Sequence, residues 1–212
     1  MTLLDLIYPP RCILCGSFLP RHEDLCENCR KNAPFFKKQK RKLRFLDSYT
    51  AVWYYKGYVR DSLLRYKFGG HDFMDRAYGR LLATRIRQDY PQGIDLLTWV
   101  PTARKRAGQR GYDQCRLLSR AVGRELGIRS VRLLKKVKNN PAQSGISDPG
   151  LRRANVAGAY ILLKPEIIRG KRILLIDDIL TTGATAGECA KILKLAGAEQ
   201  VHCAVMAAAG KL

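Results

Sequence analysis

The sequence predicts an α/β protein in which a mainly parallel sheet is flanked by helices and preceded by a small four-cysteine module. The run Ile173-Leu174-Leu175-Ile176 has no polar break, which is typical of a parallel strand buried on both faces. From Ala184 to Ala196 apolar residues recur at helical spacing, and Gly197 is a stop signal. Two Cys-x-x-Cys pairs near the N-terminus mark the separate module.

The composition is that of a globular protein with a strong excess of positive charge. The 212 residues include 39 Lys or Arg and 18 Asp or Glu, for a formal net charge of +21. This excess attracts polyanions, so nucleic acid is a candidate partner, although a generally basic proteome would give the same excess. No apolar run approaches the roughly 20 residues of a membrane span, and the first ten residues contain Asp5 without a basic start. We therefore expect a cytoplasmic chain with no membrane span.

Residues 1–36 are expected to form a module around one structural Zn²⁺. The predicted ligands are the thiolates of Cys12, Cys15, Cys26 and Cys29. Each Cys-x-x-Cys pair offers two thiolates from a tight turn, and two pairs complete a tetrahedral site with no open position. Metal binding would supply the folding energy that so few apolar residues cannot. The alternative is a redox role for one pair, which lacks the usual strand–helix context.

Residues 37–46 are expected to form a basic linker to the main domain, residues 47–212. The linker carries six positive charges in the eight residues from Lys37 to Arg44, directly after Phe35 and Phe36. A basic run beside aromatic rings could bind the phosphates of a nucleic-acid strand and stack its bases. A solvated connector between domains explains the same run equally well.

The main domain is expected to begin with a strand over 49–55, which is rich in β-forming residues. Gly57 then turns the chain, helical periodicity follows in 59–68 and 76–88, and a buried strand is expected over 95–100. The loop after that strand carries a cluster of cations, namely Arg104, Lys105, Arg106 and Arg110. Several fixed cations suit a pyrophosphate, and an ordinary basic surface loop is the alternative. A helix through Leu117 and Leu126 is expected to end at Gly127.

Residues 131–137 are expected to form a strand nearer an edge, because Lys135 and Lys136 interrupt its apolar pattern. Nearly twenty turn-forming residues follow between 138 and 157. Such a segment in a compact domain is usually a functional lid or disordered, and its polar, basic and Gly-containing sequence predicts a lid over a charged substrate. Strands are expected at 158–163 and 201–207.

The residues after the central apolar run form the candidate functional site. Asp177 and Asp178 stand where the strand should emerge, and the small residues Thr-Thr-Gly-Ala-Thr follow at 181–185. Small residues let backbone N–H groups and hydroxyls curl around one phosphate, and the next helix adds its positive dipole end. The acids could bind sugar hydroxyls or hold a metal through water. The pattern describes a ribose 5-phosphate site at the carboxyl end of a strand; a buried strand capped by acids is the alternative, which leaves the Thr-Gly run unexplained.

The run from the apolar strand through Asp-Asp to Thr-Thr-Gly-x-Thr resembles the 5-phosphoribosyl 1-pyrophosphate (PRPP) motif of type I phosphoribosyltransferases. Together with the four-cysteine module, the Arg-Gly-Tyr-Asp-Gln run at 110–114, Gln143, and Arg153-x-Asn155, it makes the chain similar to the ComF family of competence-associated, phosphoribosyltransferase-like proteins. The resemblance covers almost the whole chain. Asp113 departs from it, since the family more often has Asn there, and this leaves the role of position 113 open.

The resemblance implies a type I phosphoribosyltransferase fold that binds PRPP with Mg²⁺, and a part in the uptake of transforming DNA as single strands. It implies that Asp177 and Asp178 are catalytic. The implied PRPP-binding residues are these two acids with Thr102, Ala103, Arg104, Lys105, Arg106, Thr181, Thr182, Gly183, Ala184 and Thr185. Purine-salvage relatives carry an acid where this chain has Thr181, and a threonine cannot act as a base. The acceptor is therefore expected to differ from hypoxanthine.

Three functions remain open from the sequence. The first is an enzyme that transfers phosphoribose to an unidentified acceptor and releases pyrophosphate, which the lid and the basic loop favour. The second is a DNA-uptake factor that binds single strands, with PRPP as a ligand or regulator, which the net charge and the linker favour. A competence helicase is a candidate protein partner on the family resemblance. The third is a PRPP-sensing regulator of transcription, for which the sequence offers no recognition helix.

Overall fold

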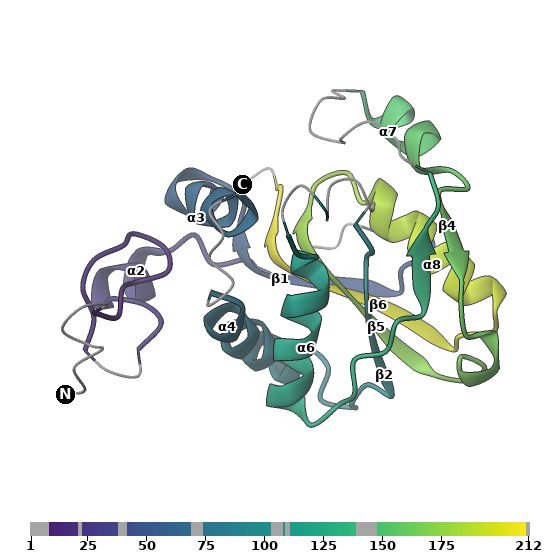
Figure 1. The fold of residues 1–212 in the computed structure, drawn as a ribbon, viewed down its shortest axis with the longest axis horizontal. Helices are drawn as coiled ribbons and strands as arrows, with labels where there is room; N and C mark the ends of the chain where they lie inside the picture. Colours follow the sequence, from purple (N-terminus) through teal and green to yellow (C-terminus); the bar gives the residue numbers. More distant parts are fainter. Residues whose placement is uncertain are drawn as a thin grey trace.

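A four-stranded parallel sheet forms the centre of the computed structural model (Figure 1). The structure describes residues 9–20, 23–37, 42–68, 74–102, 108, 111–138 and 148–210. The strands are β1 (Ser48–Tyr54), β2 (Leu96–Trp99), β5 (Arg172–Leu180) and β6 (Gln200–Ala208), in the order β1-β6-β5-β2. Each neighbouring pair is parallel, so the carboxyl ends of the four strands lie at one edge of the sheet.

Helices cover both faces of this sheet, as the sequence predicts. The helices are α3 (Gly57–Phe68), α4 (Met74–Asp89), α6 (Gln114–Leu126) and α8 (Ala184–Leu195). Alternate side chains of β5 point to opposite faces: Leu174 and Ile176 join the core formed with α4 and α6, while Ile173 and Leu175 join the core formed with α8. All four are fully buried. The unbroken apolar run from Ile173 to Ile176 is therefore explained by a strand that is buried on both faces.

Strand β5 is longer than the sequence predicts. We expected the two acids to stand beyond the end of the strand, but β5 continues through them to Leu180. The reason is that β6 extends equally far and pairs Val205 with Asp177 and Ala208 with Leu180. The acid pair is therefore fixed by sheet hydrogen bonding and is not part of the tip loop.

The segment expected to hold an edge strand and a lid has a different structure. β3 (Leu134–Lys136) and β4 (Tyr160–Leu162) pair with each other as a separate antiparallel sheet. The chain first runs beside β2, where Val131 N donates to Leu97 O at 2.8 Å, and then leaves the main sheet. The C-terminal part of the expected lid is a helix, α7 (Pro149–Val156), which Asp148 caps by accepting from Leu151 N. Residues 139–147, including Gln143, lie outside the described residues. A 3₁₀ turn, η2 (Pro165–Ile167), leads to β5.

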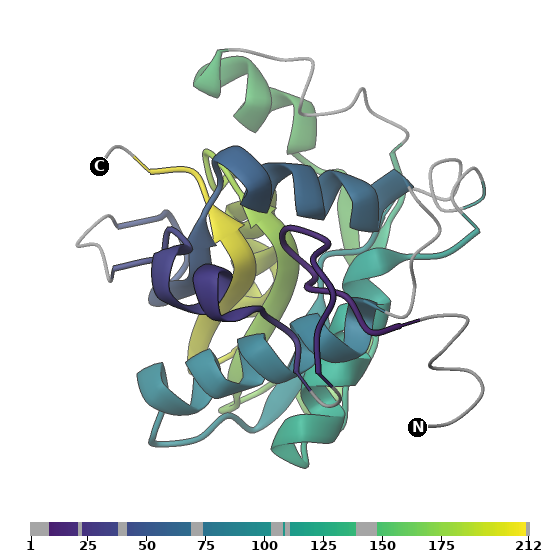
Figure 2. The same ribbon diagram turned by 90° about the vertical axis from the view of Figure 1, so that its left-hand side faces the viewer.

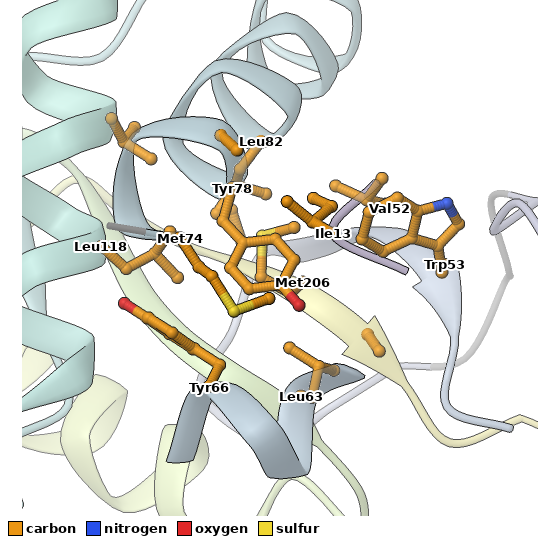
Figure 3. Close-up of a cluster of buried hydrophobic side chains, with 14 of the residues drawn as sticks. Ile13, Val52, Trp53, Leu63, Tyr66, Met74, Tyr78, Leu82, Leu118 and Met206 are labelled. Atoms are coloured by element: carbon orange, nitrogen blue, oxygen red, sulfur yellow. The ribbon is translucent and has the colours of Figure 1, made fainter. Parts of the chain in front are cut away.

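The four-cysteine module packs against α3 and α4 (Figures 1 and 2). It contains a short helix, α2 (Glu27–Asn32). Ile13 lies among the buried side chains of β1, α3 and α4, between Tyr78 and Val52 (Figure 3). Ser62 of α3 donates to the carbonyl of Ile13, and Arg65 donates to the carbonyl of Leu14 at 2.8 Å. The module and the helices therefore share one hydrophobic core.

The outer edge of β1 is covered by the segment that leads from the module to the sheet. Phe36 N donates to Val52 O at 3.0 Å, and Tyr54 N donates to Pro34 O at 2.7 Å. Phe35 forms an antiparallel bridge with Trp53. In the part of the chain that the structure describes, no helix is long and apolar enough to cross a bilayer.

Candidate functional site

The four cysteines of the N-terminal module converge on one point. The sulfur atoms of Cys12, Cys15, Cys26 and Cys29 all lie within 4.8 Å of one another. A tight turn closed by Gly16 N and Cys12 O, 2.8 Å apart, brings the first pair together, and Cys26 caps α2 so that Cys29 follows within the first turn. Four thiolates at about 2.3 Å from one ion are the usual donor set of a structural zinc. The residues present therefore fit Zn²⁺.

A second group of polar side chains lies where β5 approaches its carboxyl end. Asp177 is half-buried, and its Oδ1 accepts from Asp178 N at 2.9 Å and from the Cys115 thiol at 3.3 Å. Burial, followed by the negative charge of Asp178, raises the pKa of Asp177 to about 7. Burial raises the pKa of the Cys115 thiol well above its ordinary value. Cys115 is therefore a neutral hydrogen-bond donor that orients Asp177.

A lysine neutralises the other member of the acid pair. Lys67, in the last turn of α3, places its ammonium 2.9 Å from Asp178 Oδ2, and the two side chains are 19% and 13% exposed. Burial is the largest single influence and would lower the pKa of Lys67, but the charge and hydrogen bond of Asp178 together with the charge of Asp177 outweigh it and hold that pKa above its ordinary value. Sequence reasoning missed Lys67, which lies in a helix with no motif around it, and Cys115, which directly follows the Arg-Gly-Tyr-Asp-Gln run but is not part of it.

The Thr-Gly loop, residues 181–183, joins β5 to α8 at the same edge of the sheet. Gly183 has a φ of 80°, and Thr182 Oγ1 accepts from Ala184 N at 3.3 Å. Thr181 Oγ1 accepts from Arg152 of α7 at 3.2 Å. Residues 181–185 are all half-buried, and they include the N-cap and the first residues of α8. This is the geometry of an anion site at a helix N-terminus.

Thr102 reaches this edge from β2 and is held there by Asp113. The Asp113 carboxylate accepts from Thr102 N and from Thr102 Oγ1, each at 3.3 Å. It also caps α6 by accepting from Arg116 N at 3.3 Å. The role of Asp113 that the sequence left open is thus to tie the loop after β2 to the start of α6. The other residues predicted for this loop lie outside the described residues, namely Ala103, Arg104, Lys105, Arg106 and Arg110.

The acid pair has the chemistry of a hard-cation site. One ligand atom each from Cys115, Asp177 and Asp178 lies within 4.8 Å of the others. Mg²⁺ prefers carboxylate and phosphate oxygens and keeps several waters, whereas a protonated thiol is a poor ligand for it. The oxygens of Asp177 and Asp178 therefore fit Mg²⁺, whereas the Cys115 thiol does not.

A basic cavity of about 540 Å³ borders the Thr-Gly loop on its other side. It lies between residues 42–45, α7 and α8, and Leu43 packs against Gly183 at its edge. Its charged lining consists of Lys42, Arg44, Arg153 and Lys191 with one acid, Glu188. Phe45 lines it as well, is 36% exposed and has the Arg44 guanidinium 4.8 Å from its ring centre. The described part of the predicted linker thus forms a wall of this cavity; residues 38–41 lie outside the described residues.

Two family models match the chain. Residues 3–41 match the double zinc ribbon domain, and residues 113–211 match the phosphoribosyl transferase domain. These matches agree with the four-cysteine cluster and with the parallel sheet that carries the Asp-Asp and Thr-Gly residues. The predicted type I phosphoribosyltransferase fold with an N-terminal zinc ribbon is therefore confirmed.

The chain is also similar to curated proteins of bacteria. It is 30% identical to Competence protein F of Haemophilus influenzae over 202 residues, covering 91% of this chain and 82% of that protein. It is 29% identical to Competence protein ComFC of Streptococcus pneumoniae over 197 residues, covering 90% and 84%. It is 29% identical to the DNA utilization protein YhgH of Escherichia coli O6:H1 over 141 residues, covering 64% and 61%.

A solved structure of a glutamine PRPP amidotransferase from B. subtilis, complexed with ADP and GMP, matches at 20% identity and a TM-score of 0.44. That match covers 68% of this chain and 30% of the other.

Proposed function

Because the chain belongs to the ComF family of competence proteins, we propose that it binds PRPP with Mg²⁺ and transfers the phosphoribosyl group to an acceptor, releasing pyrophosphate. The observation that carries this proposal is the meeting of Asp177 and Asp178 with the Thr-Gly loop at one sheet edge. A diol-binding acid pair beside a phosphate-binding helix N-terminus matches the two ends of a ribose 5-phosphate. Transfer to an acceptor rests on the fold.

Each end of the ligand has its own group of residues in this proposal. Residues 181–185 and the positive end of α8 bind the 5-phosphate. The carboxylates of Asp177 and Asp178 accept from the ribose hydroxyls or bind the cation. The loop from Thr102 to Arg106 binds the pyrophosphate, with Asp113 holding Thr102 in place. Mg²⁺, when bound, supplies positive charge to the leaving group.

The transfer itself breaks the bond between C1 and the pyrophosphate oxygen. The pyrophosphate leaves with the electron pair, and positive charge develops on C1 and the ring oxygen. The neighbouring carboxylates stabilise that charge, and the basic loop stabilises the charge on the leaving group. The acceptor forms the new bond to C1 with its own electron pair. Because Thr181 cannot take a proton from it, an acceptor that is already anionic, or one that releases its proton to water, is expected.

Titration calorimetry with PRPP and MgCl₂ tests the binding step. Wild-type protein is expected to bind, and the double variant Asp177→Ala with Asp178→Ala is expected to bind at least about 100-fold more weakly, because two charged hydrogen-bond acceptors are lost. Asp95→Ala is the matched control, since Asp95 precedes β2 at the opposite sheet edge and pairs with Arg172 at 2.9 Å. Absence of heat with the wild type would overturn the proposal. Acceptor-dependent release of pyrophosphate then tests transfer.

A second candidate function is the binding of single-stranded DNA, with PRPP as a ligand or regulator. The basic cavity favours it, because cations around an exposed aromatic ring suit both the phosphates and the bases of a single strand. Affinity for a fluorescent oligonucleotide should fall steeply with salt and change when PRPP and Mg²⁺ are added. Undetectable binding near physiological salt would remove this function.

Association with a competence helicase stays a prediction, which co-purification from the source cells would test. A cytoplasmic location also stays a prediction, which cell fractionation would test.

A further inference from the structure

Lys67 is placed on the acid pair by the fold and not by chance contact of a surface side chain. Its ammonium lies 2.9 Å from Asp178 Oδ2, and both side chains are largely shielded from water. The residue before it, Tyr66, is fully buried and donates to Gln114 O at 3.3 Å. Tyr112 in turn donates to Tyr66 O at 2.7 Å. The last turn of α3 is thus attached to the start of α6, directly beside the site.

This placement creates a conflict with the cation that the site would bind. A divalent cation bound to the acid pair would approach the Asp178 oxygen on which the ammonium now lies. Two positive charges on one shielded carboxylate repel each other strongly, because little water is present to screen them. A bare divalent cation must therefore displace Lys67 and leave an ammonium without its acidic partner.

The conflict disappears if the incoming ligand is itself an anion. The lysine stem has four carbons and is flexible, so the ammonium can turn from Asp178 to a phosphate oxygen near the same sheet edge. Asp178 then becomes available to the cation that the phosphate carries. The positive charge of Lys67 is used in both states, once on a carboxylate and once on a phosphate.

We infer that Lys67 is a further binding residue of this site, which excludes bare divalent cations from the acid pair and admits them only together with a ligand of the diphosphate class. The inference rests on the proposed function for the identity of the site and adds the order of binding. Metal and diphosphate should bind with strong positive cooperativity, since each removes an obstacle to the other.

Mn²⁺ binding measured by the loss of its free electron paramagnetic resonance signal tests the inference, with zinc-loaded protein so that the cysteines are occupied. Without a diphosphate, Lys67→Met is expected to bind Mn²⁺ at least tenfold more tightly than the wild type. Lys67→Arg, which keeps the charge, should stay close to the wild type. Lys56→Met is the matched control, because Lys56 is exposed just before α3 and its loss lowers the net charge equally.

The second arm adds inorganic pyrophosphate or PRPP and measures protein-bound Mn²⁺ by equilibrium dialysis, because these ligands also bind Mn²⁺ in solution. The wild type is expected to gain at least tenfold in Mn²⁺ affinity, and Lys67→Met much less. A merely structural role for Lys67 would weaken Mn²⁺ binding in Lys67→Met, so a gain in affinity cannot come from damaged folding. If Lys67→Met fails to fold, Lys67→Gln replaces it.

The outcomes separate this inference from the function on which it rests. Equal Mn²⁺ affinity of Lys67→Met and wild type without diphosphate would overturn the role of Lys67, even if PRPP binds. A gain in Lys67→Met with no binding of PRPP to any variant would support the guarded cation site and overturn the proposed substrate.

Discussion

The two acids of β5 have different hydrogen-bond partners, and these partners give them different protonation behaviour. Asp178 has a lysine as its partner, whereas Asp177 has a thiol and a backbone N–H. Neither of those donors carries a charge, so they compensate only part of the cost of ionising a shielded carboxylate. One acid is therefore an ion-pair partner, and the other takes up a proton at a higher pH than an exposed aspartate does.

The raised pKa of Asp177 makes stability depend on pH. The folded-state pKa of about 7 lies above the unfolded value of about 3.9, so the stabilising contribution is full below about pH 4 and is lost as pH rises to about 7. Between pH 5 and pH 8 the free energy of unfolding should fall by an amount on the order of 2 kcal/mol more in the wild type than in Asp177→Asn. Urea unfolding in magnesium-free buffer measures this.

Asp95→Asn is the control for that experiment. Hydrogen bonds from Arg172 lower the pKa of Asp95 to about 2, so Asp95 does not titrate between pH 5 and pH 8. Its variant should keep the wild-type slope, and a wild-type slope in Asp177→Asn as well would contradict the assignment.

Asp113→Ala should combine a lost helix cap with a released loop. The cap of α6 is worth about 1 kcal/mol, and Asp148→Ala at the cap of α7 should cost a similar amount. Only Asp113 also holds Thr102, so Asp113→Ala should weaken PRPP binding more than Asp148→Ala does. Chemical unfolding and calorimetry give the two readouts, and equal PRPP affinities would count against the positioning of Thr102.

The sequence predicts the residues of the acid pair and the Thr-Gly loop because they are contiguous and carry a motif. It does not predict Lys67 or Cys115, since each reaches the acids across a long separation in the chain and only the packing of α3 and α6 brings them there. Arg152 was missed for a similar reason. Its contact with Thr181 depends on helix α7, and the sequence did not predict this helix because the segment 138–157 is rich in turn-forming residues.

At the level of elements, the Thr-Gly loop depends on a glycine with two constraints. Gly183 has a positive φ, and a Cβ there would lie 2.8 Å from Leu43 Cδ2. Gly183→Ala should therefore lose about 1–2 kcal/mol from the backbone conformation, with a further loss from the contact with Leu43.

Gly170→Ala is the matched control, because Gly170 has a φ of 68° and nothing within 4 Å of an added Cβ. Adding Leu43→Ala to Gly183→Ala should recover the steric part alone. Thermal unfolding of the four proteins separates the two costs, and equal stability of Gly183→Ala and Gly170→Ala would show that Leu43 does not matter.

Most helices and strands of the main domain could be predicted from the spacing of apolar residues along the sequence. The helix that ends at Gly127 and the strand at 172–176 are clear because their patterns are long and end in recognisable residues. The pairing of β3 with β4 could not be predicted, because three-residue strands carry too little pattern to show which sheet they join. The extension of β5 past the acids depends on the length of its neighbour β6.

At the scale of the whole molecule, the zinc module and the main domain are joined by a common core and by the hydrogen bonds of α3. Removing zinc should therefore disturb Trp53, which is fully buried in the core that Ile13 joins (Figure 3). In a Trp99→Phe background, a strong chelator should shift tryptophan emission to the red and lower the melting temperature by at least about 5 °C. Arg11→Ala, an exposed change in the same module, should keep the zinc-loaded spectrum. Unchanged emission after complete zinc removal would contradict this coupling.

The strand pairing of residues 34–36 with β1 has a practical consequence for anyone who shortens this protein. Cutting the chain after Phe36 would remove the cover from an outer strand in which five of the seven side chains are apolar or aromatic. An uncovered edge strand can pair with a strand of another chain, so the shortened domain should self-associate through β1. A fragment that begins before Pro34 keeps the residues that cover β1.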